Sequence, residues 1–199
     1  MPMNRVLTYA FAVLVAMSGI SCSDEEVLPN QREKLVSYLE SSHAPALVEE
    51  SQADTEAQQA FYTVSGNSVY RYIENYYAPG RDQKAQVGAS SKVTITFRAY
   101  VFTYSNITDS TFPYYSNDPL LRNAYLEMGL AEDAWSFEPL TLDMRGEILK
   151  GLRLALLGCC EGDEVEAYMT YNMAYGDANF STIPLESPVA WFFTVERVE

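Results

Sequence analysis

The stretch that decides the fold runs from Gly146 to Val198 and reads GEILKGLRLALLGCCEGDEVEAYMTYNMAYGDANFSTIPLESPVAWFFTVERV. Residues 148–157 are mostly apolar and are followed by Gly158, a pattern that predicts a helix ending in a turn. Residues 164–171 and 189–198 are strand-like, and each can bury one face. The residues on those faces are Val165, Ala167 and Met169 in the first strand and Trp191, Phe193 and Val195 in the second.

Three stretches upstream favour further strands. Residues 92–104 (KVTITFRAYVFTY) are rich in β-branched and aromatic side chains, and their first half alternates apolar residues with threonine. Residues 69–77 (VYRYIENYY) read as a strand that breaks at a Pro-Gly turn, and residues 140–142 form a short one. Strands joined by turns around one apolar helix predict an α+β fold with an antiparallel sheet.

Two further helices are expected. Residues 119–135 begin with a proline, which suits the first position of a helix. Residues 32–41 place apolar side chains at helical spacing, which predicts a short amphipathic helix. Residues 42–59 are rich in Ala, Ser, Glu and Gln, a composition that fits either a helix or a linker. The helix over 119–135 would gather its apolar residues on one side: Leu120, Ala124 and Met128.

The opening stretch resembles the FKBP-type peptidyl-prolyl isomerase pattern in the order, spacing and type of its residues. That pattern has a VIxGW helix start, a GLxGMxxGE turn, an AYG loop, an IPP segment and a final strand xLxFxVEL. Five motifs in the right order are specific, although each alone is weak. The resemblance implies a curved antiparallel sheet wrapped around a short helix. The five matching segments are residues 148–152, 157–163, 174–176, 183–184 and 189–196.

The first half of the pattern is matched less closely. Residues 93–99 resemble the VxVxYxG strand, with Phe and Ala where the family has Tyr and Gly. Residues 109–112 resemble the DGxxF start of the flap, the segment that folds over the family's active site. Pro113 then stands where the family has an acidic residue, and the helix expected at 119–135 enlarges the flap. The resemblance covers residues 69–199.

The chemistry that the resemblance implies is rotation about an X-Pro peptide bond, against a barrier of about 20 kcal/mol. No nucleophile, metal or cofactor is needed, because an apolar pocket that excludes water favours the twisted amide. The resemblance implies that the Tyr175 hydroxyl and the Leu149 backbone N–H hold substrate carbonyls, and that Leu152 forms the pocket floor in place of the usual tryptophan. The implied walls are Phe97, Phe112, Phe137, Ile148, Ile183 and Trp191, with Phe193 as the alternative to Trp191.

Packing alone offers a competing interpretation of these residues. Aliphatic side chains at 148, 149 and 152 would also be needed to pack a helix against a sheet. Trp191 is equally suited to a core and to a pocket wall. Cys159 corresponds to a buried methionine of the family turn, which predicts a small core residue.

The N-terminus resembles a lipoprotein signal. Arg5 precedes an apolar run too short to span a bilayer comfortably, and Gly19-Ile20-Ser21-Cys22 resembles a lipobox. We expect cleavage before Cys22 and its lipidation; the alternative is a plain signal peptide cut elsewhere. The acidic residues that follow form either a surface-export signal or a solvated tether.

Composition narrows the function further. A net charge of −14 argues against nucleic acid or an anionic lipid surface as a partner. His43 is the only histidine, no CxxC pair occurs, and Cys159 and Cys160 are adjacent. This argues against a zinc site, a Cys-His nucleophile and a disulfide framework.

These observations predict a signal peptide at 1–21, a lipidated cysteine with an acidic tether at 22–31, a helical or linker extension at 32–68, and an FKBP-like domain at 69–199. The expected function is a cofactor-free isomerase or folding helper for proline-containing segments of exported proteins. It would be lipid-anchored to the outer membrane in the cell envelope, and weakly active because of Leu152 and Pro113. The alternatives are an FKBP-like binding module that has lost efficient catalysis and a structural subunit without a groove.

Overall fold

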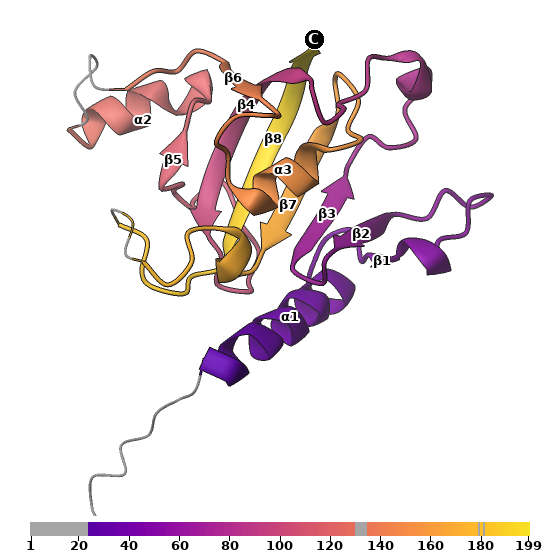
Figure 1. Ribbon diagram of the computed structural model, residues 1–199, viewed down its shortest axis with the longest axis horizontal. Helices are drawn as coiled ribbons and strands as arrows, with labels where there is room; N and C mark the ends of the chain where they lie inside the picture. The colour runs from indigo at the N-terminus through magenta and orange to yellow at the C-terminus, as the bar shows by residue number, and fades with distance from the viewer. Residues whose placement is uncertain (1–23, 130–134, 179, 181) are drawn as a thin grey trace, which may run out of the picture.

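The computed structural model describes residues 24–129, 135–178, 180 and 182–199 (Figure 1). They form an eight-stranded sheet in the order β1-β2-β3-β7-β8-β4-β5, with β6 also paired to β4. The strands are β1 (Val48–Glu49), β2 (Phe61–Ser65), β3 (Val69–Ile73), β4 (Lys92–Val101), β5 (Tyr115–Ser116), β6 (Leu140–Asp143), β7 (Glu164–Met169) and β8 (Val189–Val198). The described helices are α1 (Asp24–Ser41), α2 (Arg122–Glu127) and α3 (Lys150–Leu156), with 3₁₀ turns η1 (Glu50–Gln52), η2 (Arg81–Gln83), η3 (Pro119–Leu121) and η5 (Tyr171–Met173).

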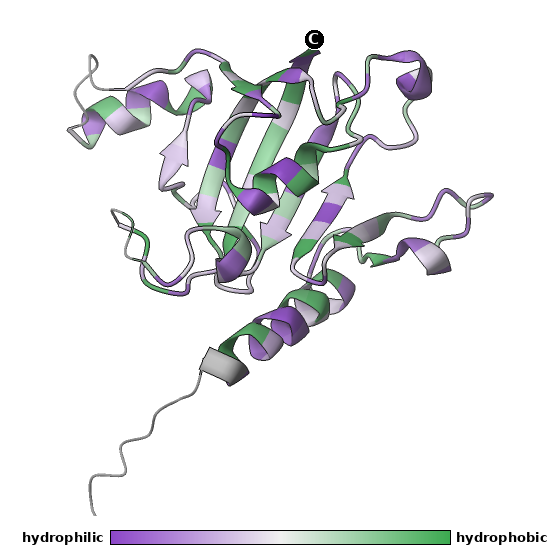
Figure 2. Ribbon diagram, in the orientation of Figure 1, coloured by the Kyte–Doolittle hydropathy of each residue, from purple (hydrophilic) through white to green (hydrophobic). Residues whose placement is uncertain are grey.

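The centre of the sheet is antiparallel, as expected from the alternation along its strands. Phe97 of β4 lies opposite Phe193 of β8, and Ala99 lies opposite Trp191. The apolar faces predicted for β7 and β8 are buried against α3, which lies across this face of the sheet (Figures 1 and 2). The predicted α+β fold, a sheet that covers a short helix, is therefore confirmed.

A second core lies on the other face of the sheet, because side chains alternate along each strand. Tyr168 belongs to this second core, whereas its neighbours Ala167 and Met169 belong to the first. Leu35 and Leu39, one helical turn apart on α1, are both fully buried against the second core. The N-terminal helix is thus packed on the sheet and is part of the same folded unit.

The N-terminal tether was predicted wrongly for residues 24–31. The helix expected at 32–41 is present, but it already begins at Asp24. The reason is tertiary: Gln31 is 6% exposed and hydrogen-bonds to a loop 140 or more residues away, a contact that local composition does not reveal. Cys22 and the predicted signal peptide at 1–21 lie outside the described residues. Among the described helices, none is long and apolar enough to cross a membrane.

The helix expected at 119–135 is shorter than predicted. It consists of η3 and α2, and residues 130–134 lie outside the described part of the chain. The prediction that Leu120 and Met128 lie on its buried side was wrong, since Leu120 is 82% and Met128 is 68% exposed. Tyr125 is buried instead, because its ring packs against Phe112 and its hydroxyl donates to the Pro113 carbonyl at 3.0 Å. The undecided region at 42–59 contains β1 and η1, and β2 was not anticipated.

Candidate functional site

The start of α3 is placed by a close approach to the sheet. A Cβ atom on Gly151 would lie 2.5 Å from Met169 Sδ and 3.0 Å from the Met173 carbonyl oxygen. Only glycine allows this approach, which explains the glycine of the helix-start motif. The approach brings Leu149, the residue before the helix, close to η5 and the loop that follows it.

The two predicted hydrogen-bond donors share one shallow hollow. Leu149 and Tyr175 both line it, together with Ile148, and Phe180 lies at its side. In the described part of the chain, the Leu149 backbone N–H donates to no other residue. The hollow therefore offers a free N–H and a phenol to the same ligand. Its other lining residues are Glu147, Lys150, Asn172, Ala174 and Gly176.

The Tyr175 ring is held between two other aromatic rings. Its face stacks on Phe180, with ring centroids 4.6 Å apart and planes 14° apart. Its edge meets Tyr114, and the two hydroxyl oxygens share a hydrogen bond at 3.1 Å. Burial raises the pKa of Tyr175, an effect that the bond to Tyr114 partly offsets. Tyr175 is therefore a neutral hydroxyl donor at any physiological pH.

Tyr114 closes the inner end of the site. It packs against the core cluster that contains Phe97, Leu152 and Trp191, and its backbone N–H donates to the Ala99 carbonyl at 2.9 Å. Burial strongly raises the pKa of its hydroxyl. The Trp191 indole lies beside that hydroxyl without a well-aligned hydrogen bond, so its buried Nε1 is unpaired among the described residues. Tyr114 thus packs against the residues that the resemblance assigns to the floor and walls of the pocket.

Hydrogen bonds from the flap to β4 hold the segment that follows Tyr114. The Ser116 hydroxyl donates to the Phe97 carbonyl at 2.7 Å. The Asn117 side chain accepts from the Phe97 N–H at 2.7 Å and donates to the Ile95 carbonyl at 3.0 Å. These bonds fix the segment in which Pro113 replaces the acidic residue of the family. The flap therefore holds Tyr114 against the core.

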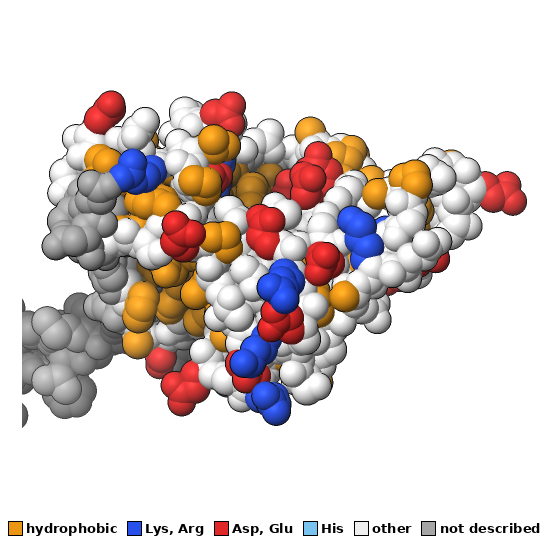
Figure 3. All heavy atoms as spheres, turned by 90° about the horizontal axis from the view of Figure 1, so that it is seen from above, with side chains coloured by type: hydrophobic (Ala, Val, Ile, Leu, Met, Phe, Trp, Pro, Cys, Tyr) orange, Lys and Arg blue, Asp and Glu red, His pale blue; other side chains and the backbone are white. Residues whose placement is uncertain are grey.

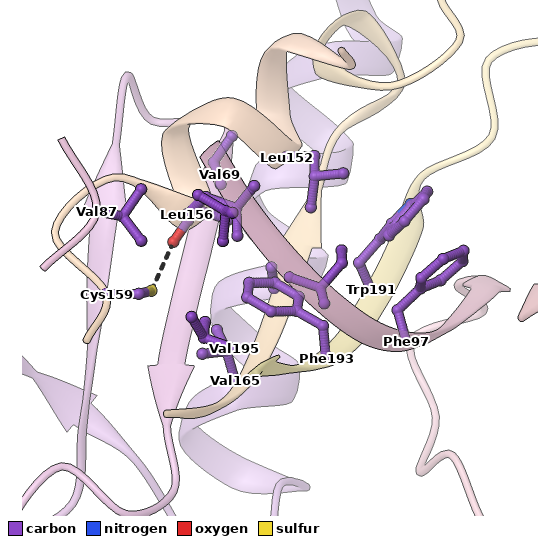
Figure 4. Packing of buried hydrophobic residues seen from close by; sticks show 14 of the residues in the cluster. Val69, Val87, Phe97, Leu152, Leu156, Cys159, Val165, Trp191, Phe193 and Val195 are labelled. Atoms are coloured by element: carbon purple, nitrogen blue, oxygen red, sulfur yellow. Dashed lines mark hydrogen bonds between the residues drawn. The ribbon is translucent and has the colours of Figure 1, made fainter. Parts of the chain in front are cut away.

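The predicted floor and wall residues lie in four places. Phe97 and Trp191 stack with centroids 4.7 Å apart, and Leu152 lies with them in the core (Figure 4). Phe193 belongs to the same cluster, because it lies two residues from Trp191 on one face of β8. Their roles in binding stay predictions. The remaining wall residues are Ile148 in the hollow, Ile183 buried beyond Phe180, and Phe112 and Phe137, which both contact Tyr125 in the flap.

Two aromatic residues of the site were not anticipated. Tyr114 follows the point where the flap departs from the family pattern, so the resemblance assigned it no role. Phe180 is the one aromatic residue between Tyr175 and Ile183, in a stretch that is otherwise small or polar. Its isolation was the feature of the sequence that could have identified Phe180 as part of the site. Cys159 is fully buried, as predicted for a small core residue, and burial raises the pKa of its thiol to about 11.

Apolar side chains adjoin the hollow, whose own lining also includes Glu147, Lys150 and Asn172. Phe180 is 55% exposed, and Figure 3 shows hydrophobic side chains gathered on the side of the molecule that carries the flap. A more enclosed cavity of about 410 Å³ lies elsewhere, between β2, β3 and η2. It contains Gly158 but neither Tyr175 nor Leu149, so it is separate from this site. No group of three or more metal-ligating side chains occurs in the described residues.

Comparison with known proteins connects this geometry to a family. Residues 130–196 match the sequence profile of the FKBP-type peptidyl-prolyl cis-trans isomerases. A search of curated proteins finds no match. The structure is similar to a peptidyl-prolyl cis-trans isomerase from Pseudomonas syringae pv. tomato, with a TM-score of 0.54 and 12% identity over 89% of this chain and 96% of that one.

A second similar structure is FkpA from Escherichia coli, with a TM-score of 0.46 and 15% identity over 73% of this chain and 55% of that one. A third is the N-terminal domain of FKBP42 from Arabidopsis thaliana, with a TM-score of 0.44 and 14% identity over 69% and 91% of the two chains. At such identities the likeness concerns the fold alone, and we rest it on the Pseudomonas structure. Residues 130–196 therefore match the FKBP-type peptidyl-prolyl cis-trans isomerase profile, and the fold of the chain is similar to that of the Pseudomonas isomerase.

Proposed function

We propose that this chain is a lipid-anchored peptidyl-prolyl isomerase of the cell envelope that acts slowly on proline-containing segments of exported proteins. The observation that carries the proposal is the shared hollow of Tyr175 and Leu149. A hydroxyl and a free backbone N–H there face one open space beside an apolar core. This is the arrangement that an X-Pro substrate needs at its carbonyls.

The residues would act by orientation and exclusion of water. The Leu149 N–H and the Tyr175 hydroxyl would hold substrate carbonyls while the prolyl ring lies against the aromatic residues. An apolar surface stabilises the planar amide less than water does, because the planar form is the more zwitterionic. The barrier to rotation falls without any covalent step.

Slow turnover follows from the position of Tyr114. Its hydroxyl already pairs with Tyr175, and its ring packs where a proline would approach Phe97 and Trp191. A substrate must displace this side chain before it reaches the core. Catalysis therefore includes an opening step, and only the fraction of molecules in which Tyr114 has moved aside can bind substrate.

Exchange spectroscopy on a labelled prolyl peptide tests the activity. The chain from residue 24 should increase cis-trans exchange. Tyr175→Phe should reduce the increase by roughly tenfold at most, because one hydrogen bond contributes about 0.5–1.5 kcal/mol. Tyr77→Phe is the matched control, since its hydroxyl contacts the Gln59 carbonyl far from the site. Equal activity of wild type and Tyr175→Phe would remove Tyr175 from the mechanism.

The lipid anchor is supported by Arg5, the apolar run and the lipobox-like segment that ends at Cys22. In the full chain, Cys22→Ala should abolish acylation and release the protein from the detergent phase on partitioning. Membrane association that survives this change would contradict the anchor. The acidic residues after Cys22 are either a surface-export signal or a solvated tether. Protease digestion of intact cells distinguishes these two roles, because only a surface-exposed protein is cleaved.

A second candidate is a binding module with little or no catalysis. The Tyr114–Tyr175 hydrogen bond favours it, because the predicted catalytic hydroxyl is already paired in the free protein. The same peptide distinguishes the two functions. Chemical-shift changes at Tyr175 without faster exchange, at high protein concentration, would establish binding alone.

A further inference from the structure

We infer that Gln31 of the N-terminal helix is a positioning residue for Tyr175. The inference deepens the proposed isomerase function, because it names what sets the geometry of the same site. Gln31 lies on α1, far from the matched segment in sequence, and its amide is buried against the loop that carries Tyr175. The family resemblance assigned no role to this helix.

One side-chain amide holds both ends of that loop. Gln31 Nε2 donates to the Glu186 carbonyl oxygen at 2.7 Å. Gln31 Oε1 accepts from the Tyr171 backbone N–H at 3.0 Å. The donor and the acceptor of a single amide are both used, so the Gln31 side chain fixes the separation of Tyr171 and Glu186.

The same two residues bond to the neighbour of Tyr175. The Gly176 N–H donates to the Tyr171 carbonyl at 2.8 Å, and the Glu186 N–H donates to the Gly176 carbonyl at 3.3 Å. Gln31, Tyr171, Gly176 and Glu186 therefore form a closed ring of hydrogen bonds. Gly176 adopts a φ of 72°, which only glycine adopts readily, and this turn sets the direction of Tyr175.

The helix itself is anchored independently of Gln31. Leu35 and Leu39 are buried in the second core, and Arg32 donates to the Ser68 hydroxyl at 2.9 Å. Replacing Gln31 should therefore leave α1 docked while it releases the loop. Loss of the amide would remove the bonds from Gln31 to the Tyr171 N–H and the Glu186 carbonyl and let Tyr175 move relative to the Leu149 N–H.

The test compares Gln31→Met, which has a similar size but no amide, with two controls in the same helix. Asn30→Met changes an exposed neighbour. Val36→Ala weakens the packing of α1 without touching the loop. We would measure kcat/KM by exchange spectroscopy, the melting temperature, and the amide resonance and microsecond dynamics of Gly176 by NMR.

Gln31→Met should lower kcat/KM by about tenfold, since small misplacements of substrate-orienting groups are costly. It should also shift and broaden the Gly176 amide, whereas Asn30→Met and Val36→Ala leave that amide unchanged. An unaltered Gly176 amide in Gln31→Met, or equal changes in Val36→Ala, would overturn the inference. If wild type shows no exchange activity, the proposed function fails, but the Gly176 signal still decides the inference.

Discussion

Tyr114 and a substrate compete for the same hydroxyl. In the free protein, the Tyr114 and Tyr175 hydroxyls share a hydrogen bond at 3.1 Å in which either oxygen can be the donor. Where Tyr175 donates, a substrate carbonyl must replace Tyr114 as the acceptor. The competition depends only on the Tyr114 hydroxyl, because the Tyr114 ring would keep its packing if the hydroxyl were removed. A phenylalanine at this position separates the two effects.

Tyr114→Phe should raise kcat/KM on prolyl peptides by about twofold to tenfold. The reason is that, where Tyr175 donates to Tyr114, a net hydrogen-bond contribution of about 0.5–1.5 kcal/mol no longer has to be lost before binding. Exchange spectroscopy measures the change, and Tyr115→Phe is the matched control, since Tyr115 is the exposed neighbour at 38%. A fall in activity would show instead that Tyr114 assists the reaction.

At the scale of elements, α3 depends on the absence of a side chain at Gly151. The residue lies where the helix, β7 and η5 meet, and a methyl group there would collide with the Met169 sulfur and the Met173 carbonyl. The sulfur can move, but the carbonyl belongs to η5, which leads directly to Tyr175. A substitution therefore strains both the helix and the site.

Gly151→Ala should lower the free energy of unfolding by about 1–3 kcal/mol, the usual cost of overpacking. Urea unfolding measures it. Gly88→Ala is the control, because a Cβ there would meet nothing closer than Ser91 Oγ at 3.8 Å. Equal stability of Gly151→Ala and wild type would mean that α3 can shift without loss of packing.

Local pattern was sufficient for some elements and insufficient for others, for physical reasons. β7 and β8 were predicted because alternation alone defines their buried faces. Local sequence did not predict the helix over 24–31 or the burial of Tyr125. Both depend on contacts with residues elsewhere in the chain. Similarly, motif order pointed to Tyr175 and Leu149, which share a hollow. It could not find Tyr114, whose importance comes from its hydrogen bond across the flap.

At the scale of the whole molecule, a buried histidine links the turn after α1 to the sheet. His43 Nε2 bonds to Glu166 Oε2 of β7 at 2.8 Å, and Nδ1 bonds to the Pro45 carbonyl at 2.7 Å. Burial lowers the pKa of His43, but the bonds to Glu166 and Pro45 outweigh it, so the pKa is raised above its ordinary value. The protonated form stabilises the docking of the N-terminal segment.

The sign of the pH dependence follows from this raised pKa. The stabilisation is complete below the unfolded value of about 6.5 and is lost as the pH rises through the folded value. The free energy of unfolding of wild type, relative to His43→Phe, should therefore fall as the pH rises above about 6.5. Urea titrations of both proteins at each pH measure the difference. A difference that stays constant or grows with pH would contradict the assignment.

The sheet ends in short strands on both sides. Its long central strands, β4 and β8, have ten residues each, whereas the strands at its two ends, β1 and β5, have two each. The far side of β4 is shared between β5 and β6. Short borders offer few unpaired amides to a second chain, which protects against edge-to-edge aggregation. A protein with such short end strands can thus expose apolar side chains without recruiting other chains as additional strands.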